Sequence, residues 1–103
     1  MKRDQIIATL RAHEPELKAA GIASLSLFGS IARGDDRGDS DIDVAVRLSD
    51  HSSFRGFAYF GHLDRLARQL ETILGRPVDI VVEPVQKERL RRQIEEDRAV
   101  AFL

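Results

Sequence analysis

Two pairs of residues in the first half of the chain have types and a spacing that suit phosphate chemistry. Gly29-Ser30 is followed, after ten intervening residues, by Asp41 and Asp43. A glycine lets the backbone approach an anion closely, and exposed N–H groups and a serine hydroxyl donate hydrogen bonds to phosphate oxygens. Two carboxylates can converge on one cation. The segment therefore combines a candidate phosphate-binding turn with a candidate metal site.

The acidic pair lies at the start of an expected strand. In segment 41–48 apolar residues alternate with Asp41, Asp43 and Arg47, which predicts a strand with its apolar face in the core. Asp41 and Asp43 then project from one face with backbones about 6.6 Å apart. Two bare charges at that separation would repel by roughly 2.5 kcal/mol at an effective dielectric of about 20. A divalent cation relieves this repulsion, and carboxylate ligands favour Mg²⁺ or Mn²⁺ over Zn²⁺.

Asp79 is a third candidate ligand. It lies alone among the apolar residues of segment 78–82, which predicts a further strand after Pro77. If this strand neighbours the strand at 41–48, Asp79 shares a sheet face with the acidic pair. Two metal ions about 3.5 to 4 Å apart, bridged by such carboxylates, would hold a triphosphate. Taken singly, the three features also fit an ordinary turn, a solvated strand end and a strand-edge acid paired with arginine.

The elements that must position these residues follow from periodicity. Strands are predicted at 22–29, 41–48 and 78–82, and helices or helical turns at 3–13, 15–21, 30–33, 59–75 and 86–97, with a linker at 49–56. The order predicts an α/β (α+β) domain with a small three-stranded sheet flanked by helices. The sheet is expected to be mixed, because the first two strands are joined by a connection too short for a parallel crossover. We expect residues 1–103 to form a single domain.

Composition narrows the class of protein. The chain has 43% hydrophobic and 32% charged residues, a net charge of −1 and no cysteine. It shows no long apolar run and no basic-then-apolar leader, so we expect a cytoplasmic protein that neither enters a membrane nor binds nucleic acid directly. The many arginines of the second half form either a solvated helix face or a contact surface for an acidic partner. We expect His13, His51 and His62 at the surface.

Three segments carry a family resemblance. Leu27-Phe28-Gly29-Ser30-Ile31-Ala32-Arg33-Gly34 and Ser40-Asp41-Ile42-Asp43-Val44 resemble the signature of the minimal nucleotidyltransferases (MNT proteins), which belong to the DNA polymerase β-like nucleotidyltransferase superfamily. Leu74-Gly75-Arg76-Pro77-Val78-Asp79-Ile80-Val81 resembles the strand that holds the family's third carboxylate. The resemblance spans nearly the whole chain and implies the polymerase β-like nucleotidyltransferase fold.

The resemblance implies transfer of a nucleotide monophosphate, usually AMP from ATP, to an acceptor hydroxyl with release of pyrophosphate. By position, Asp41 and Asp43 would bind two Mg²⁺ ions, and Asp79 would complete the catalytic metal site and help activate the acceptor. Gly29 and Ser30 would hold the β and γ phosphates. The neighbouring Arg33 is expected to brace the acidic loop through Asp35 or Asp36 rather than to contact phosphate.

The resemblance also implies a partner. Minimal nucleotidyltransferases are often antitoxins that adenylylate a tyrosine of a HEPN-domain ribonuclease toxin encoded beside them, so a HEPN-type toxin and ATP are the expected partners. One alternative is a non-catalytic antitoxin that neutralises its partner by binding alone. The other is a nucleotidyltransferase that acts on a small molecule or on RNA, for which an extra domain or a basic face near the site is expected.

Overall fold

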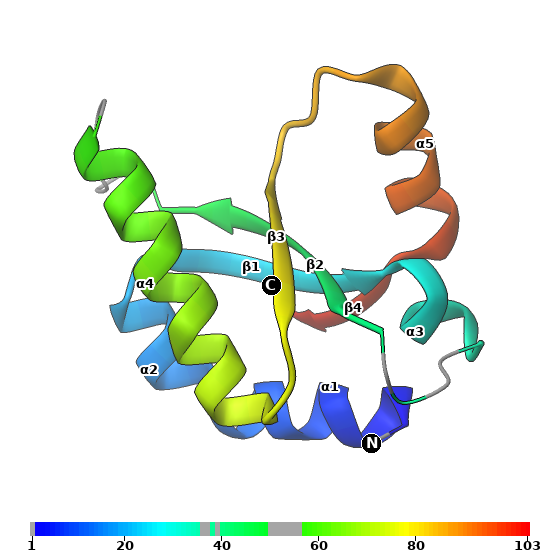
Figure 1. Cartoon of the computed structure of the whole chain (residues 1–103), viewed down its shortest axis with the longest axis horizontal. Helices are drawn as coiled ribbons and strands as arrows, with labels where there is room; N and C mark the ends of the chain where they lie inside the picture. The colour runs from blue at the N-terminus through cyan, green and yellow to red at the C-terminus, as the bar shows by residue number, and fades with distance from the viewer. Residues whose placement is uncertain (1, 36–37, 39, 50–56) are drawn as a thin grey trace.

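The strands form a mixed sheet across the middle of the protein (Figure 1). The computed structural model describes residues 2–35, 38, 40–49 and 57–103. Within them the sheet has the order β3-β2-β1-β4, with β1 antiparallel to both of its neighbours and β2 parallel to β3. The strands are β1 (Ile22–Phe28), β2 (Ile42–Leu48), β3 (Val78–Val82) and β4 (Ala99–Phe102). The predicted mixed sheet is confirmed.

The prediction of three strands is wrong, because β4 adds a fourth. β4 pairs with β1 antiparallel, with Phe102 opposite Leu25. Its sequence, Ala-Val-Ala-Phe, is apolar throughout, so it lacks the alternation of polar and apolar residues that marks a half-buried strand. It also follows the last helix with only Arg98 between them.

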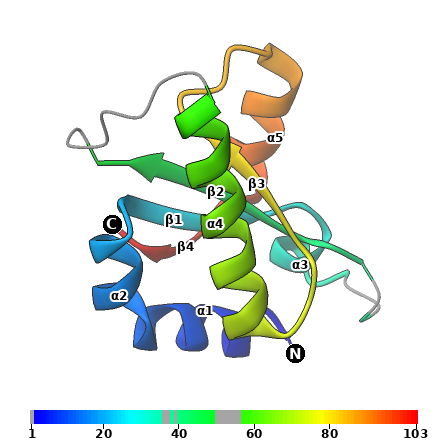
Figure 2. The ribbon, with the colours of Figure 1, turned by 60° about the vertical axis from the view of Figure 1, so that its left-hand side comes forward.

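Helices cover both faces of the sheet. They are α1 (Arg3–Ala12), α2 (Glu14–Ala19), α3 (Gly29–Arg33), α4 (Phe57–Leu74) and α5 (Glu88–Asp97). Figures 1 and 2 show α1, α2 and α4 on one side of the sheet and α5 on the other, with α3 next to α5. The helices expected at the N-terminus, before Gly75 and after Pro84 are thus confirmed. None of the helices in the described ranges is long and apolar enough to cross a membrane.

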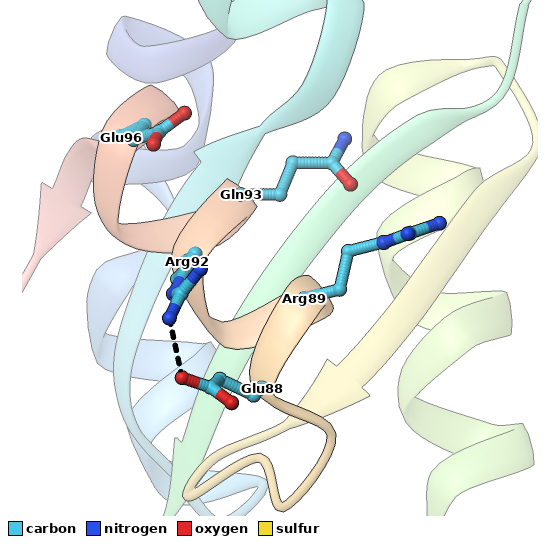
Figure 3. A pocket seen from close by; sticks show the side chains of 5 residues that line it. All are labelled: Glu88, Arg89, Arg92, Gln93 and Glu96. Atoms are coloured by element: carbon cyan, nitrogen blue, oxygen red, sulfur yellow. Dashed lines mark hydrogen bonds and ion pairs between the residues drawn. The ribbon is translucent and has the colours of Figure 1, made fainter.

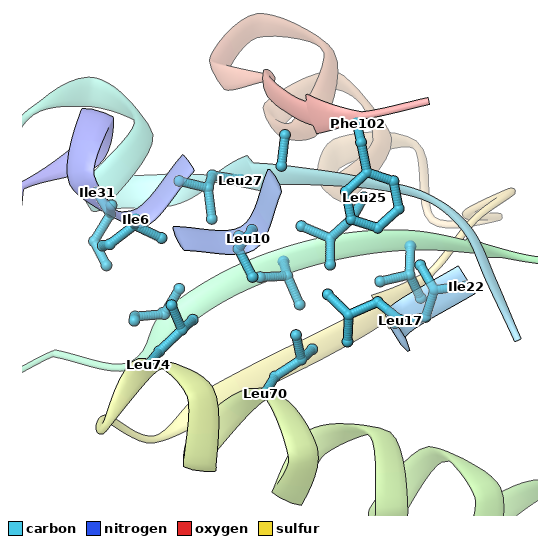
Figure 4. Close-up of a cluster of buried hydrophobic side chains, with 14 of the residues drawn as sticks. Ile6, Leu10, Leu17, Ile22, Leu25, Leu27, Ile31, Leu70, Leu74 and Phe102 are labelled. Atoms are coloured by element: carbon cyan, nitrogen blue, oxygen red, sulfur yellow. The ribbon is translucent and has the colours of Figure 1, made fainter. Parts of the chain in front are cut away.

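The main core lies between the sheet and helices α1, α2 and α4 (Figure 4). Its members include the buried alternate residues of β2 and the apolar stripe of α4. The largest fully buried side chains are Ile6, Leu10, Leu17, Ile22, Leu25, Leu27, Ile31, Ile42, Leu66, Leu70, Ile94 and Val44, and all of these except Ile94 belong to this core. Removing these side chains from water is the main driving force for folding.

His62 contradicts the expectation that the histidines lie at the surface. Its residue is 7% exposed, and burial, followed by repulsion from Arg65, lowers the pKa of its imidazole. The ring packs against Gly21, at which an added Cβ would lie 3.1 Å from Nε2. His13 is partly exposed, whereas His51 and most of the expected linker at 49–56 lie outside the described residues.

Candidate active site

Asp43 and Asp79 lie directly opposite each other on neighbouring strands. β2 and β3 pair in parallel with Ile42 opposite Val78 and Asp43 opposite Asp79. Residues in register on adjacent strands project to the same face, with backbones about 4.8 Å apart. The condition that these two strands are neighbours is therefore met, and the pairing brings two of the three candidate carboxylates together.

The three acids affect one another electrostatically. Asp43 is half-buried, whereas Asp41, just before β2, and Asp79 are exposed. Burial raises the pKa of the Asp43 carboxyl above its usual range, and the negative charges of Asp79 and Asp41 raise it further. The positive charge of Arg33 opposes this shift. Asp43 is thus the acid that gains most from a cation placed among the three.

The donor atoms fit a hard divalent cation, although the side chains do not form a finished cage. In the part of the chain that the structure describes, no three histidine or acidic side chains are grouped closely enough to hold a metal ion. The carboxylates of Asp43 and Asp79 nevertheless share one sheet face, and the charge of Asp41, just before β2, acts on Asp43. Carboxylate oxygens are the ligands that Mg²⁺ and Mn²⁺ prefer. The set fits Mg²⁺ if the exposed Asp41 and Asp79 side chains turn toward Asp43.

Gly29 brings the candidate phosphate-binding turn into contact with the acidic strand. It follows β1 at once, has φ of +77°, and an added Cβ would lie 2.3 Å from Oδ2 of Asp43. No real Cβ comes that close to an oxygen, and the positive φ also disfavours a side chain. A side chain at position 29 would therefore have to displace the Asp43 carboxylate. The Gly29-Ser30 turn and Asp43, separate in the sequence, thus lie side by side.

Arg33, in the last turn of α3, pairs with two acids. Its Nε donates to Oδ2 of Asp35 at 3.3 Å, and its Nη1 donates to Oδ2 of Asp97 at 2.8 Å. The expected contact with Asp35 is confirmed, while Asp36 lies outside the described residues. The pair with Asp97 was not predicted, because the two residues are 64 positions apart and lie on different helices. It connects α3 to α5 beside the carboxylates.

Comparison with known proteins identifies the family. The family described as "Nucleotidyltransferase domain" matches residues 10–101. The chain belongs to the nucleotidyltransferase family. A Methanocaldococcus jannaschii protein provisionally named protein adenylyltransferase MJ1379 is 34% identical over 95 residues, which cover 90% of this chain and 91% of that protein. Protein adenylyltransferase MntA of Thermococcus cleftensis is 30% identical over 92 residues, which cover 88% and 87%.

Solved structures agree with this assignment. A structure provisionally described as a minimal nucleotidyltransferase superposes with a TM-score of 0.74 at 31% identity, covering 96% of this chain and 95% of the other. A toxin–antitoxin crystal structure with AMP-PNP superposes with a TM-score of 0.63 at 26% identity, covering 99% of this chain and 73% of that one. The fold and the enzyme class expected from the sequence are confirmed.

Helix α5 packs on the sheet face that carries Asp43 and Asp79. Ile94 of α5 packs on Phe28 and Ala45, and Leu90 and Val81 pack against this small cluster. Just after α5, both Nη atoms of Arg98 donate to the buried carboxylate of Glu83. Nη1 of Arg98 also donates to the Ser26 hydroxyl. These contacts hold α5 against this face, on which Asp79 stays exposed.

A shallow pocket of about 390 Å³ follows the outer side of α5 (Figure 3). Its lining residues are Glu88, Arg89, Arg92, Gln93 and Glu96. Arg89 and Gln93 point away from α5 to the same side, and Arg92 pairs with Glu88. Because the acidic and basic side chains balance, this pocket does not select for a polyphosphate.

Proposed function

We propose that the protein is a Mg²⁺-dependent nucleotidyltransferase that transfers AMP from ATP to a hydroxyl, that of a tyrosine in a HEPN-type ribonuclease toxin, and thereby acts as an antitoxin. The observation that carries the catalytic part is the backbone of Gly29 lying against Asp43, with Asp79 directly opposite. This contact supports a phosphate-binding turn beside a metal-binding set of acids.

The residues of the chain have separate roles in the proposed transfer. Backbone N–H groups at Gly29 and the Ser30 hydroxyl donate to the β and γ phosphates. Asp41, Asp43 and Asp79 would hold two Mg²⁺ ions, and the bound metal would supply charge neutralisation for the triphosphate.

Asp79 is the residue proposed to activate the acceptor. The acceptor oxygen forms a bond to the α-phosphorus, the bond from that phosphorus to the bridging oxygen breaks, and pyrophosphate leaves. The proton of the hydroxyl passes to the Asp79 carboxylate, which is exposed and free to approach it. The exposure of Asp79 gives a protein side chain access to this carboxylate.

The partner is proposed from the relatives. Curated relatives that match nearly the full length of this chain carry names as protein adenylyltransferases, and a structure with the same fold is a toxin–antitoxin complex with AMP-PNP. Those names support a protein acceptor over a small molecule or RNA. They do not identify the acceptor, so the tyrosine and the HEPN domain rest on the family resemblance.

The test is incubation of the purified protein with α-labelled ATP, Mg²⁺ and the product of the neighbouring gene. We expect label on the partner, loss of label in Asp41→Asn and Asp43→Asn, and full label in Asp64→Asn, an exposed acid on α4. Silencing of the partner without label would indicate an antitoxin that acts by binding alone. Label on RNA or on a small molecule instead would identify the other alternative.

A further inference from the structure

Two hydrogen bonds hold the residues on either side of Asp41. Nη2 of Arg76 donates to the Ser40 carbonyl at 2.6 Å, and the Ile42 N–H donates to the Pro77 carbonyl at 2.9 Å. Ser40 and Ile42 are thus both bonded to the short segment that precedes β3. Asp41 lies between these two points of attachment.

The Arg76 bond acts where the strand pairing ends. The β2–β3 ladder begins with Ile42 opposite Val78, so Asp41 precedes the first paired residue of β2. A guanidinium reaches farther than a backbone N–H and gives a charge-assisted hydrogen bond to the carbonyl of Ser40. The side chain of Arg76 therefore holds Ser40, which lies before the first paired residue of the ladder.

The segment to which Arg76 belongs is itself fixed. The Glu71 carboxylate accepts a hydrogen bond from the Val78 N–H at 3.1 Å, and the Glu71 carbonyl accepts one from the Gly75 N–H at 2.7 Å. Arg76 lies between these two anchored residues and is partly buried. It is therefore a rigid support rather than a loose surface arginine.

We propose that Arg76 is the positioning residue of the acidic site, which sets the place of Asp41 relative to Asp79. Arg76 binds the carbonyl next to Asp41, and Asp79 lies three residues after Arg76, so one side chain links the two ends of the ligand set. Small errors in ligand position lower metal affinity strongly. This inference rests on the proposed function, because it takes the three acids to be the metal ligands.

The test measures metal binding rather than turnover alone. Free Mn²⁺ is followed by electron paramagnetic resonance while Mn²⁺ alone is titrated into the full chain. We expect Arg76→Ala to weaken Mn²⁺ binding by about tenfold or more, and Arg76→Lys, which keeps a charged donor, to remain within about threefold of wild type. Asp41→Asn serves as the reference for a lost ligand.

A matched control comes from the opposite side of the protein. Nε of Arg11 donates to the Ala101 carbonyl at 2.7 Å, which is the same kind of bond, also partly buried, on helix α1. Arg11→Ala should therefore lower the midpoint of thermal unfolding, Tm, as Arg76→Ala does, and leave Mn²⁺ binding unchanged. Equal weakening of Mn²⁺ binding in the two variants would overturn the proposal.

The remaining outcomes separate the inference from the proposed function. If Arg76→Ala does not fold, Arg76→Gln decides, and Mn²⁺ binding as in wild type would overturn the proposal. If the wild type transfers AMP and Arg76→Ala needs no more Mg²⁺ than the wild type does, the inference fails alone. If no transfer occurs but Mn²⁺ binding falls as expected, the positioning role stands and the proposed function fails. A wild-type chain that binds no Mn²⁺ would overturn both.

Discussion

The two faces of the β2–β3 pair differ in what their side chains do. On one face, Ile42, Val44 and Val46 are fully buried under α1, α2 and α4. On the other, Asp43 and Asp79 lie opposite each other, and Ile94 of α5 packs on the nearby Phe28 and Ala45. Strand alternation assigns successive residues to these faces, so stability and chemistry are separated by a single position in the chain.

This difference implies that the acids are kept at some cost to the metal-free fold. Burial and two neighbouring negative charges raise the pKa of Asp43, which means that the folded state disfavours its ionised form. A residue that served stability would instead be matched by a cation or by hydrogen bonds. The acidic face therefore has the character of a binding site, and changes on each face should affect different properties.

The largest expected effect is on activity, from Asp43→Asn. Loss of this carboxylate should lower AMP transfer on the order of a thousandfold, since metal and charge stabilisation at such a site is worth about 4 kcal/mol. The Tm of the metal-free variant should equal or exceed that of the wild type. A single-turnover assay measures AMP transfer, and thermal unfolding measures the Tm. Asp64→Asn, which changes an acid away from the site, is the matched control. A variant that unfolds at lower temperature and still transfers AMP would contradict the division between the faces.

The converse change is Leu70→Ala, in the core on the other face. Leu70 is fully buried, and truncation of such a leucine costs about 2 to 5 kcal/mol of the free energy of unfolding. Transfer per folded molecule should stay at the wild-type level. Denaturant unfolding measures the free energy of unfolding. AMP transfer per folded molecule is assayed at a temperature well below the Tm. Loss of transfer in a fully folded sample would show that the two faces are coupled.

Gly29→Ala should affect both properties, because Gly29 belongs to the fold and to the site. The positive φ costs about 1 to 2 kcal/mol, and the added Cβ must displace the Asp43 carboxylate, for which about a hundredfold loss of transfer is expected. Gly34→Ala is the control, since Gly34 has φ of +82° and nothing within 4 Å of an added Cβ. It should lose stability alone. Equal transfer by the two variants would refute the contact between Gly29 and Asp43.

The smallest effect is a pH dependence of stability. Because the pKa of Asp43 is raised on folding, its stabilising contribution is full below the unfolded pKa of about 3.9 and is lost as pH rises through the folded value. The Tm of the metal-free wild type should therefore fall relative to Asp43→Asn as pH rises from about 3.5 to 7, and Mg²⁺ should reverse the difference. A Tm difference that is constant over this range would contradict the shift.

Most of the fold could be predicted, because its signals are local. The alternation in β2 and the stripe of α4 each lie within one element. β4 could not, since its uniformly apolar residues have meaning only beside β1. The burial of His62 likewise depends on a distant turn at Gly21, which no local pattern shows.

The candidate site was predictable in composition but not in assembly. The sequence gives the residue types and their order, and strand alternation gives the face of each acid. That Asp43 and Asp79 lie opposite each other depends on the pairing of β2 with β3 and on its register. The sequence alone does not determine this pairing. The bonds of Arg33 to Asp97 and of Arg76 to Ser40 cross between elements, so they could be found only from the structure.

The most direct test of the central claim is a crystal structure of the protein with AMP-PNP and Mn²⁺, with anomalous diffraction used to place the metal. We predict anomalous peaks between the carboxylates of Asp41, Asp43 and Asp79, and the phosphate tail against Gly29 and Ser30. Metal or nucleotide bound elsewhere, for example in the pocket along α5 with the three acids unoccupied, would contradict the account.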